Sequence, residues 1–380
     1  MRALIYRGKN NLRIETIPVP EIKSDELLVE VAVCGVCPTD IKKIQYGTVT
    51  PPRIFGHETA GTIVRVGARV KKFRIGDRVG LHHHVPCLKC RVCKHGVFAQ
   101  CETYKRTGIT AGFEPAGGGY AEYVRVMPFV FPGIVQIPAK NSFIEGAMLE
   151  PVNTVLKAIN RLNLLRGDYV LVAGQGPIGL VFTRLLSFRG IKVVASDLLE
   201  PRLHLARQFG AMVALNASDP CFEKIVRRTT NKGLLDAAVI AVPSVETVLL
   251  AESLIRGGGQ ILLFAHTRRG NHLDIDPATI CVDEKDLIGS YSSDLTLQSE
   301  VARLIFSRKL DVRELITHQF PLQEAAAAIK LAARPMPDSL KILVNQTGEK
   351  RESVKSKTQR RKRHKDAGRD TIFSSFMSHH

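Results

Sequence analysis

Apolar residues follow two different patterns in the two halves of this chain. Up to about residue 150, short runs rich in valine, isoleucine and threonine, such as Leu27–Val33 and Gly61–Val70, are separated by closely spaced glycines and prolines. This spacing is typical of a compact, barrel-like β-rich domain, in which we expect further strands at 77–80 and 120–126.

From about residue 154, short apolar strands alternate with longer helical stretches. Strands are predicted at 169–173, 192–196, 237–242 and 260–264, and helices at 178–188, 201–209 and 245–254. Regular alternation of this kind predicts a parallel, doubly wound α/β sheet. A short α/β segment then runs from about residue 290 to Val344. The chain is therefore expected to combine a β-rich domain with an α/β domain.

Composition narrows the class of protein. Of the 380 residues, 44% are hydrophobic and 24% are charged, which excludes a wholly disordered chain. No apolar run reaches the roughly 18 residues that a membrane-spanning helix needs, so no such helix is expected. The first ten residues lack the charged-then-apolar pattern of a secretory signal, which argues against secretion and favours a cytoplasmic location.

The formal net charge of +18 is unevenly distributed along the chain. Residues 347–380 hold ten Lys or Arg and four Asp or Glu, so six of the 18 charges lie in this tail. The tail has too little apolar surface to offset the entropy cost of ordering, so we predict that it is disordered. A basic tail can bind nucleic acid or another acidic partner, but a solvated extension without a partner is the interpretation we favour.

Four of the eight cysteines are clustered with gaps of two, two and seven residues. Such clustering, in a long chain without a signal peptide, favours metal binding over disulfide bonds or unrelated free thiols. Four thiolates complete a closed tetrahedral zinc site, which leaves no position for substrate and is therefore structural; an iron–sulfur cluster is the rival interpretation. The residues of this candidate site are Cys87, Cys90, Cys93 and Cys101.

A G-x-G-x-x-G motif occupies 174–179, directly after a predicted strand and at the start of a predicted helix. In this context the glycines permit a tight turn, close approach of a pyrophosphate and close packing of helix on strand. The helix N-terminus offers free N–H groups to phosphates. A proline in the first turn lacks a backbone N–H, but an N–H at that position would have no partner within the helix. The candidate cofactor-binding residues of this loop are Gly174, Gly176, Pro177, Ile178 and Gly179.

Asp197 lies 23 positions after Gly174, at the end of the next predicted strand. A carboxylate at this point can accept hydrogen bonds from ribose hydroxyls and would repel a 2′-phosphate, so NAD is favoured over NADP. Arg202 keeps NADP open, because a nearby arginine can accommodate that phosphate.

Three further signals are Cys34–Asp40, Gly56–Glu58 and Glu150–Pro151. Together with the four-cysteine loop and the glycine motif, in this order and spacing, they make the chain resemble the zinc-dependent medium-chain alcohol and polyol dehydrogenases over residues 1–346. The resemblance implies a GroES-like β-rich catalytic domain at 1–153 and 291–346, and a Rossmann NAD-binding domain at 154–290.

The resemblance also implies a catalytic zinc site in the first domain. Cys37 and His57 match the family's zinc ligands, and Glu150 occupies the position of the third. With a carboxylate at this position, the ligand set resembles that of the sorbitol and threonine dehydrogenase-like branch. The ethanol branch instead uses two cysteines and a histidine. Glu58 matches a supporting or exchangeable ligand. Zinc with an open position lowers the pKa of a bound alcohol.

Residues around these ligands also match the family. Asp40 would orient His57 by accepting its second ring N–H, and Thr39 matches the hydroxyl that takes the substrate's proton. Many relatives carry a histidine that ends the proton relay, and this chain has Lys42 at that position. A lysine with its usual pKa is charged at pH 7 and is therefore a poor proton shuttle. The candidate substrate-pocket residues are Gln45 and Tyr46.

These expectations favour reversible, NAD-linked oxidation of a secondary alcohol or polyol to a ketone, with two zinc ions per chain. The alternatives are an NADP-dependent carbonyl or aldehyde reductase, an L-threonine 3-dehydrogenase-like enzyme and a protein tethered to nucleic acid through its tail. The resemblance implies a homodimer or homotetramer, with pairing expected near 260–264 or 288–292.

Overall fold

The structure is a computed structural model of the chain. It describes residues 1–346 except 83, 107, 115, 231, 232, 266, 268 and 269. The predicted disordered tail, 347–380, lies outside the described residues. Within the described part of the chain, no helix has the length and apolarity that crossing a bilayer demands.

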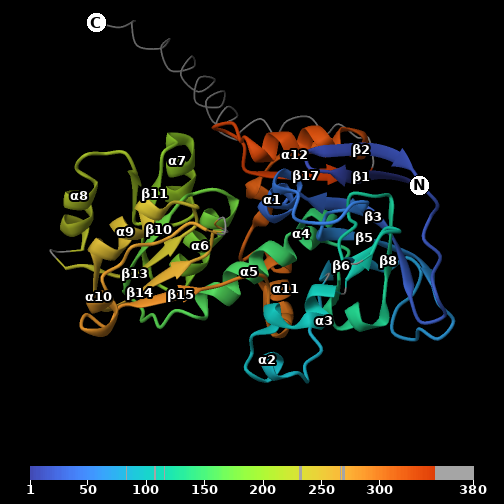
Figure 1. Cartoon of the computed structure of the whole chain (residues 1–380), viewed down its shortest axis with the longest axis horizontal. Helices are drawn as coiled ribbons and strands as arrows, with labels where there is room; N and C mark the ends of the chain where they lie inside the picture. Colours follow the sequence, from blue (N-terminus) through green and yellow to red (C-terminus); the bar gives the residue numbers. More distant parts are fainter. Residues whose placement is uncertain are drawn as a thin grey trace, which may run out of the picture. The chain divides into compact units, whose positions relative to one another are not determined.

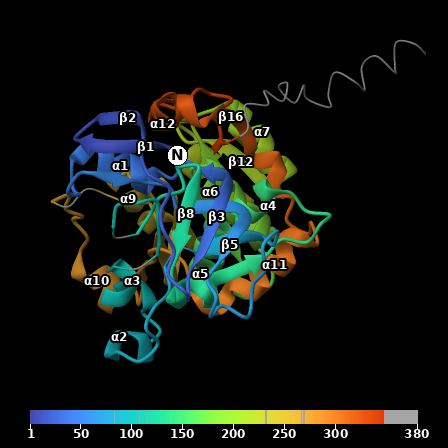
Figure 2. The ribbon, with the colours of Figure 1, turned by 90° about the vertical axis from the view of Figure 1, so that its right-hand side faces the viewer.

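The β-rich part consists of a three-stranded and an eight-stranded sheet (Figure 1). The strands are β1 (Arg2–Gly8), β2 (Asn11–Thr16), β3 (Leu27–Gly35), β4 (Arg53–Ile54), β5 (Glu58–Val66), β6 (Arg78–His82), β7 (Ile109–Thr110), β8 (Tyr123–Val126), β9 (Ile134–Gln136), β16 (Ile316–Pro321) and β17 (Lys341–Asn345). The small sheet has the order β2-β1-β4, and the large one β16-β17-β3-β5-β6-β9, with β8 paired to β3 and β7 to β8. Figure 2 shows β3, β5 and β8 side by side.

Short helices accompany these sheets. They are α1 (Pro38–Tyr46), α2 (Arg91–Lys94), α3 (Glu102–Arg106), α4 (Phe143–Ala147), α11 (Gln298–Phe306) and α12 (Ala325–Ala333). Apolar side chains of α1 and α12 join a core built from β1, β3, β5 and β8. Because β16 and β17 pair into the same sheet as β3, the end of the described chain returns to the β-rich part.

The α/β part is a six-stranded parallel sheet with the order β12-β11-β10-β13-β14-β15. Its strands are β10 (Tyr169–Ala173), β11 (Lys192–Asp197), β12 (Val213–Asn216), β13 (Leu235–Ile240), β14 (Ile255–Leu263) and β15 (Asp286–Gly289). Its helices are α5 (Leu149–Ile159), α6 (Pro177–Phe188), α7 (Glu200–Gln208), α8 (Phe222–Thr229), α9 (Val245–Leu254) and α10 (Pro277–Cys281).

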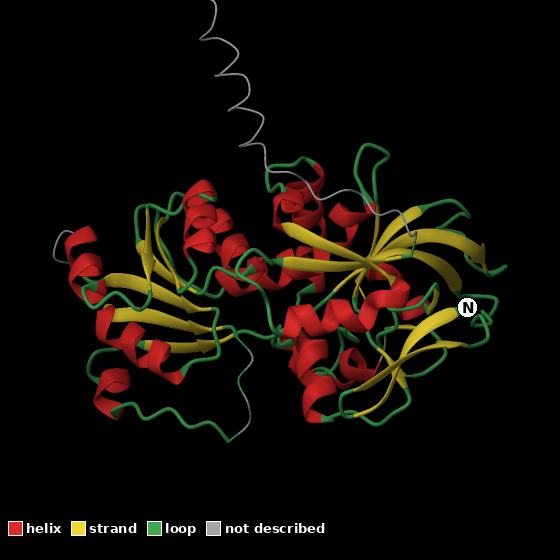
Figure 3. Cartoon of the chain, turned by 90° about the horizontal axis from the view of Figure 1, so that it is seen from above, coloured by secondary structure: helices red, strands yellow, loops and turns green. Residues whose placement is uncertain are grey.

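Helices cover both faces of this sheet, as Figure 3 shows. Apolar side chains of α5, α6 and α7 pack on one face, and those of α8 and α9 pack on the other. The predicted doubly wound α/β sheet is therefore confirmed. The first turn of α5 carries Glu150 and its later turns pack on the parallel sheet, so this helix links the two parts.

Several element boundaries differ from the sequence-based prediction. β5 begins at Glu58 and ends at Val66 instead of covering 61–70, because a turn closed by the Val70 N–H to the Gly67 carbonyl ends the strand. Gly67 sits so close to the backbone carbonyl of Ser24 that a Cβ would lie 2.4 Å from its oxygen. The hairpin β1–β2 and the elements β12, α8 and β15 were not predicted.

Candidate metal and cofactor sites

Cys37, His57 and Glu58 come together from two places in the sequence. Cys37 immediately precedes α1, where Pro38 starts the helix without losing a paired donor. His57 and Glu58 stand at the start of β5, after Gly56, whose positive φ of 100° suits a glycine. One potential ligand atom from each of the three lies within 4.8 Å of the others. This is the geometry expected of a metal site with mixed S, N and O donors.

Asp40 holds the imidazole of His57. Its Oδ1 lies 3.2 Å from Nδ1 of His57, and its Oδ2 accepts the Gly56 N–H at 3.2 Å. Burial would lower the pKa of His57, but the facing carboxylate of Asp40 and the thiol of Cys37 raise it well above the usual range. Because Asp40 engages Nδ1, the other ring nitrogen of His57 is the one available to a metal.

Glu150 is buried in the first turn of α5, beside this cluster but not within 4.8 Å of all three ligand atoms. Burial raises the pKa of its carboxyl to about 7; His57 opposes this effect and Glu58 adds to it. Lys341 also favours the charged form of this carboxyl, but burial outweighs both cations, and a divalent metal ion would stabilise the carboxylate further.

Lys341 is a member of this cluster that the sequence did not reveal. It is the first residue of β17 and is buried, with its Nζ in an ion pair with Oε2 of Glu58 and donating to the Val36 carbonyl at 3.0 Å. Burial would lower its pKa, but the facing Glu58 and Cys37 raise it. The only local signal is a lysine at the start of an apolar strand, far from Glu58 in sequence.

The other predicted residues of the catalytic site lie on α1, the helix that follows Cys37. Thr39 is half-buried in the first turn of α1, and Lys42 lies on the same helix with its pKa lowered by burial. Gln45 and Tyr46 are exposed at the end of α1, and 50% of the Tyr46 surface is accessible.

The four predicted cysteines form a second cluster with mutually close sulfur atoms. The Sγ atoms of Cys90 and Cys93 are 3.4 Å apart, and the Cys87 N–H lies 3.5 Å from Sγ of Cys101. Against the effect of burial, the N–H groups of Cys87 and Tyr104 lower the pKa of the Cys101 thiol to about 6. Thiols that stay close together with N–H donors aimed at them fit a four-thiolate zinc site.

The glycine motif forms the turn between β10 and α6. Gly174 has a positive φ of 92°, and a Cβ on Gly179 would lie 1.8 Å from the Gly174 carbonyl oxygen. A Cβ on Gly176 would meet nothing within 4 Å, so open space lies beside the helix N-terminus. Pro177 starts the helix, and Ile178 is half-buried behind it. These features fit a dinucleotide pyrophosphate.

Asp197 ends β11 next to this turn. Its Oδ2 accepts the Gln175 N–H at 2.7 Å, and its Oδ1 accepts the Leu199 N–H at 3.0 Å. Arg202 places Nη1 3.7 Å from the same carboxylate. The carboxylate and the guanidinium therefore stand together at the position predicted for the adenosine ribose.

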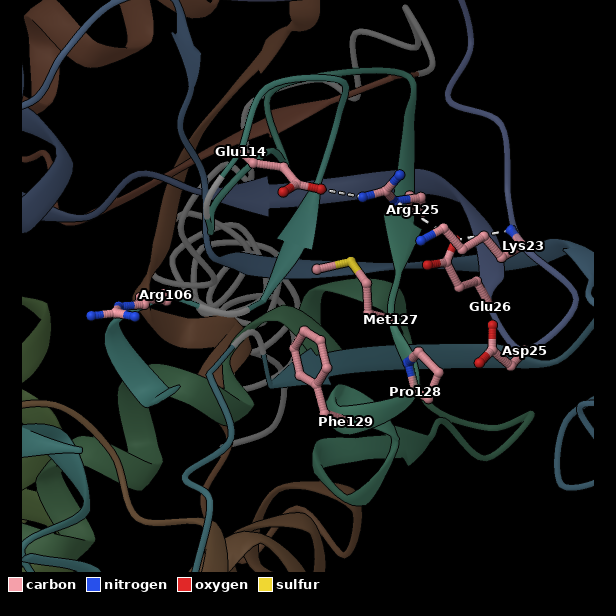
Figure 4. Close-up of a pocket in the computed structure, with 9 residues that line it drawn as sticks. All are labelled: Lys23, Asp25, Glu26, Arg106, Glu114, Arg125, Met127, Pro128 and Phe129. Atoms are coloured by element: carbon pink, nitrogen blue, oxygen red, sulfur yellow. Dashed lines mark hydrogen bonds and ion pairs between the residues drawn. The ribbon is translucent and has the colours of Figure 1, made fainter. Parts of the chain in front are cut away.

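A pocket of about 380 Å³ lies elsewhere in the β-rich part (Figure 4). None of the predicted site residues lines it. Arg125 pairs with Glu114 across its upper side and lies 3.8 Å from Glu26, so its opposite charges largely offset one another. The lining residues are Lys23, Asp25, Glu26, Arg106, Glu114, Arg125, Met127, Pro128 and Phe129.

Comparisons with known proteins agree with this geometry. Residues 23–138 match the model of the alcohol dehydrogenase GroES-like domain, and residues 177–307 match that of the zinc-binding dehydrogenases. A D-arabinitol dehydrogenase of Uromyces fabae is 30% identical over 342 residues, which cover 88% of this chain and 95% of the relative. The chain belongs to the zinc-dependent medium-chain alcohol and polyol dehydrogenases.

Two further relatives of this dehydrogenase extend the comparison. The sorbitol dehydrogenase of Bombyx mori is 29% identical over 354 residues, covering 90% of this chain and 98% of the relative. A solved structure from Sinorhizobium meliloti, described as a zinc-binding dehydrogenase bound to NADP, has a TM-score of 0.81 and 26% identity, covering 90% of this chain and 98% of its own. The predicted family, GroES-like and Rossmann fold class and oxidoreductase activity are confirmed.

Proposed function

We propose that this dehydrogenase reversibly oxidises a secondary alcohol or polyol to a ketone, with NAD as the hydride acceptor. The observation that carries the proposal is the cluster of Cys37, His57 and Glu58, with Asp40 orienting His57 and the buried carboxyl of Glu150 nearby. The names of the sorbitol and arabinitol dehydrogenase relatives support a polyol substrate. The test is a panel of alcohols and polyols, each assayed with NAD and with NADP.

The residues of the cluster fit a catalytic zinc ion. We propose Cys37, His57 and Glu150 as its ligands, with Glu58 as the exchangeable one, and the four cysteines as a second, structural site. When bound, zinc supplies the Lewis acidity that brings the pKa of an alcohol toward neutrality, and a nicotinamide supplies the hydride acceptor. Asp40 keeps the His57 ring in place throughout the reaction. Thr39 would accept the proton of the substrate hydroxyl while releasing its own hydroxyl proton to solvent, so that one proton leaves the site for each alcohol oxidised.

Domain boundaries and location follow from the same proposal. We propose that residues 1–153 and 291–346 form the catalytic domain and residues 154–290 the cofactor domain. Pairing of β16 and β17 into the sheet of β3 supports this division.

Every cysteine lies within the described residues and is free of disulfide bonds, which favours a reducing compartment such as the cytoplasm.

We propose NAD rather than NADP, with the Asp197 carboxylate binding the adenosine ribose. In support, this carboxylate lies at the end of β11 beside the glycine turn, and backbone N–H groups order both of its oxygens. NADP is the alternative cofactor, and it is supported by Arg202 beside this carboxylate and by the relative solved with NADP. Replacing Asp197 with alanine should shift the ratio of kcat/KM with NAD to that with NADP at least about tenfold toward NADP, since a hydrogen bond to a charged group contributes roughly 1.5–3 kcal/mol. Steady-state kinetics with both cofactors measure this ratio.

The matched control for this ratio is Asp197→Asn. Asparagine keeps an acceptor oxygen for one of the two backbone N–H groups but loses the negative charge, so a ratio that shifts in both variants reports electrostatic repulsion of the phosphate. An unchanged ratio in both variants would contradict the assignment of Asp197 to the ribose site.

We propose that two copies of this dehydrogenase pair through β15. The expected pairing at 260–264 is not an edge contact, because β14 lies between β13 and β15. β15 is the last strand of the sheet and, with α10, exposes Ile280, Val282 and Leu287. An open strand edge with apolar neighbours is a ready pairing surface. Light scattering should give a dimer that Leu287→Lys weakens at least about tenfold, whereas Leu249→Lys on α9 leaves it intact.

A further inference from the structure

Residues 290–294, which we call the crossover segment, carry the chain from the end of β15 back to the β-rich part. The segment is held from α5. The Tyr291 carbonyl accepts a hydrogen bond from Nζ of Lys157 at 2.7 Å. The Asp294 N–H donates to Oδ1 of Asn153 at 2.7 Å, and Nδ2 of Asn153 donates back to the Asp294 carbonyl at 2.9 Å. The backbone of the crossover segment is therefore fixed to the helix whose first turn enters the proposed metal site.

The crossover segment lies next to the proposed catalytic cluster. Ser293 is fully buried, and its Oγ lies 3.3 Å from Nε2 of His82, which is the register partner of Glu58 across β5 and β6. Asn153 stands three residues after Glu150, on the same side of α5. The segment also begins at the carboxyl end of the parallel sheet, where dinucleotides bind. A shift of its backbone would therefore disturb both the metal site and the cofactor site.

Ser292, in the middle of the crossover segment, has a left-handed backbone with a φ of 61°. This conformation is unfavourable for a residue with a Cβ and persists only where neighbouring groups hold it. The Ser292 hydroxyl shares a hydrogen bond with the hydroxyl of Tyr104, far away in sequence. This side-chain bond holds the segment at the point where its backbone is strained.

Tyr104 reaches the crossover segment from the four-cysteine loop. It is a residue of α3 with 3% of its surface accessible, and its ring packs against that of His84, with the two centroids 4.7 Å apart. Its backbone N–H donates to the thiol of Cys101. One buried residue therefore contacts a predicted ligand of the structural zinc through its backbone and Ser292 through its side chain.

We propose that Tyr104 is a positioning residue for the reaction. Its hydroxyl keeps Ser292 in the left-handed conformation and thereby sets the course of the crossover segment beside the metal and cofactor sites. Its N–H ties the same residue to the four-cysteine loop, so this loop supports catalysis as well as folding. The inference rests on the proposed function, because it assumes that the reaction takes place at the cluster of Cys37, His57 and Glu58.

Two variants of Ser292 test whether the backbone conformation is what matters. Alanine removes the hydroxyl but keeps a Cβ, whereas glycine adopts a positive φ without strain. Ser292→Ala should therefore lower kcat at least about tenfold, since a small misplacement of groups at an active site is costly. Ser292→Gly should retain at least about half of kcat, because glycine does not need the bond to Tyr104.

Tyr104→Phe tests the partner of this bond, because it keeps the ring and the backbone N–H but lacks the hydroxyl. Its kcat should fall at least about tenfold while the chain keeps about two zinc ions. In hydrogen–deuterium exchange of the full-length protein, the amides of the crossover segment should exchange at least about tenfold faster. Adding Ser292→Gly to Tyr104→Phe should restore most of the lost kcat.

The matched control is Tyr169→Phe, which removes a hydroxyl that accepts a hydrogen bond from Nζ of Lys192 at 3.1 Å in the α/β part. This variant should change neither kcat nor the exchange of the crossover segment.

Equal loss of kcat in Ser292→Ala and Ser292→Gly would overturn the proposal, because the hydroxyl would then act through its own chemistry. Unchanged kcat and exchange in Tyr104→Phe would overturn it too. Loss of zinc from Tyr104→Phe would also overturn it, since the hydroxyl would then act on the cysteine loop. If Tyr104→Phe does not fold, the two Ser292 variants decide. An unmodified protein that oxidises no alcohol would contradict the proposed function instead, and the exchange rates would still test the role of Tyr104.

Discussion

Replacing His57 with alanine should lower kcat/KM for the preferred alcohol at least about a thousandfold and remove one of two zinc ions per chain. Lewis-acid stabilisation by a metal contributes several kcal/mol to the transition state, and each 1.36 kcal/mol corresponds to a factor of ten in rate. His57 is the central nitrogen donor of the cluster, and Asp40 fixes its ring at 3.2 Å. Kinetics and zinc analysis on the same preparation provide the measurement.

The control for this variant is His272→Ala, an exposed histidine in the α/β part. It should retain both zinc ions and full turnover. A His57→Ala protein with both zinc ions and undiminished kcat/KM would show that the cluster of Cys37, His57 and Glu58 is not the catalytic centre.

Replacing Cys93 with serine should remove the other zinc ion and lower the thermal midpoint by about 10 °C. Structural zinc contributes binding energy directly to folding, and the loss of some 3 kcal/mol or more shifts Tm by roughly 2–4 °C per kcal/mol in a chain larger than a small domain. The effect should also reach the rest of the fold, because the Tyr104 N–H faces the Cys101 thiol and the Tyr104 hydroxyl bonds to Ser292. Differential scanning calorimetry and zinc analysis measure both changes.

Cys281→Ser provides the comparison, since Cys281 is exposed and far in sequence from the cysteine cluster. It should keep two zinc ions and an unchanged midpoint. If Cys93→Ser also kept both metals and its midpoint, the four cysteines would be ordinary thiols.

The features that could be predicted from sequence are those whose residues lie close together along the chain. The glycine motif at 174–179 and the cysteines from Cys87 to Cys101 each lie within 15 residues, so their spacing alone indicates the chemistry. The alternation of apolar strands and helices after residue 154 predicted the parallel sheet for the same reason. The very short β12 and β15 lack enough residues to show a period, which is why they were missed.

The parts that could not be predicted depend on pairing between distant segments. Lys341 reaches Glu58 only because β17 joins the sheet beside β3, and nothing in the local sequence of either residue indicates the contact. The same limitation applies to the two carboxylates. Sequence resemblance suggested Glu150 as the third ligand, whereas the structure places Glu58 in the tighter cluster with Cys37 and His57.

The proposal that this dehydrogenase oxidises a polyol with NAD is tested most directly by a single preparation assayed for zinc and for turnover. The account predicts about two zinc ions per chain and formation of NADH with sorbitol- or arabinitol-like polyols, with turnover abolished when a chelator removes the first-site metal and restored when zinc is added back. Turnover that persists after both metals are removed, or no turnover of any alcohol with either cofactor in the two-zinc protein, would contradict it.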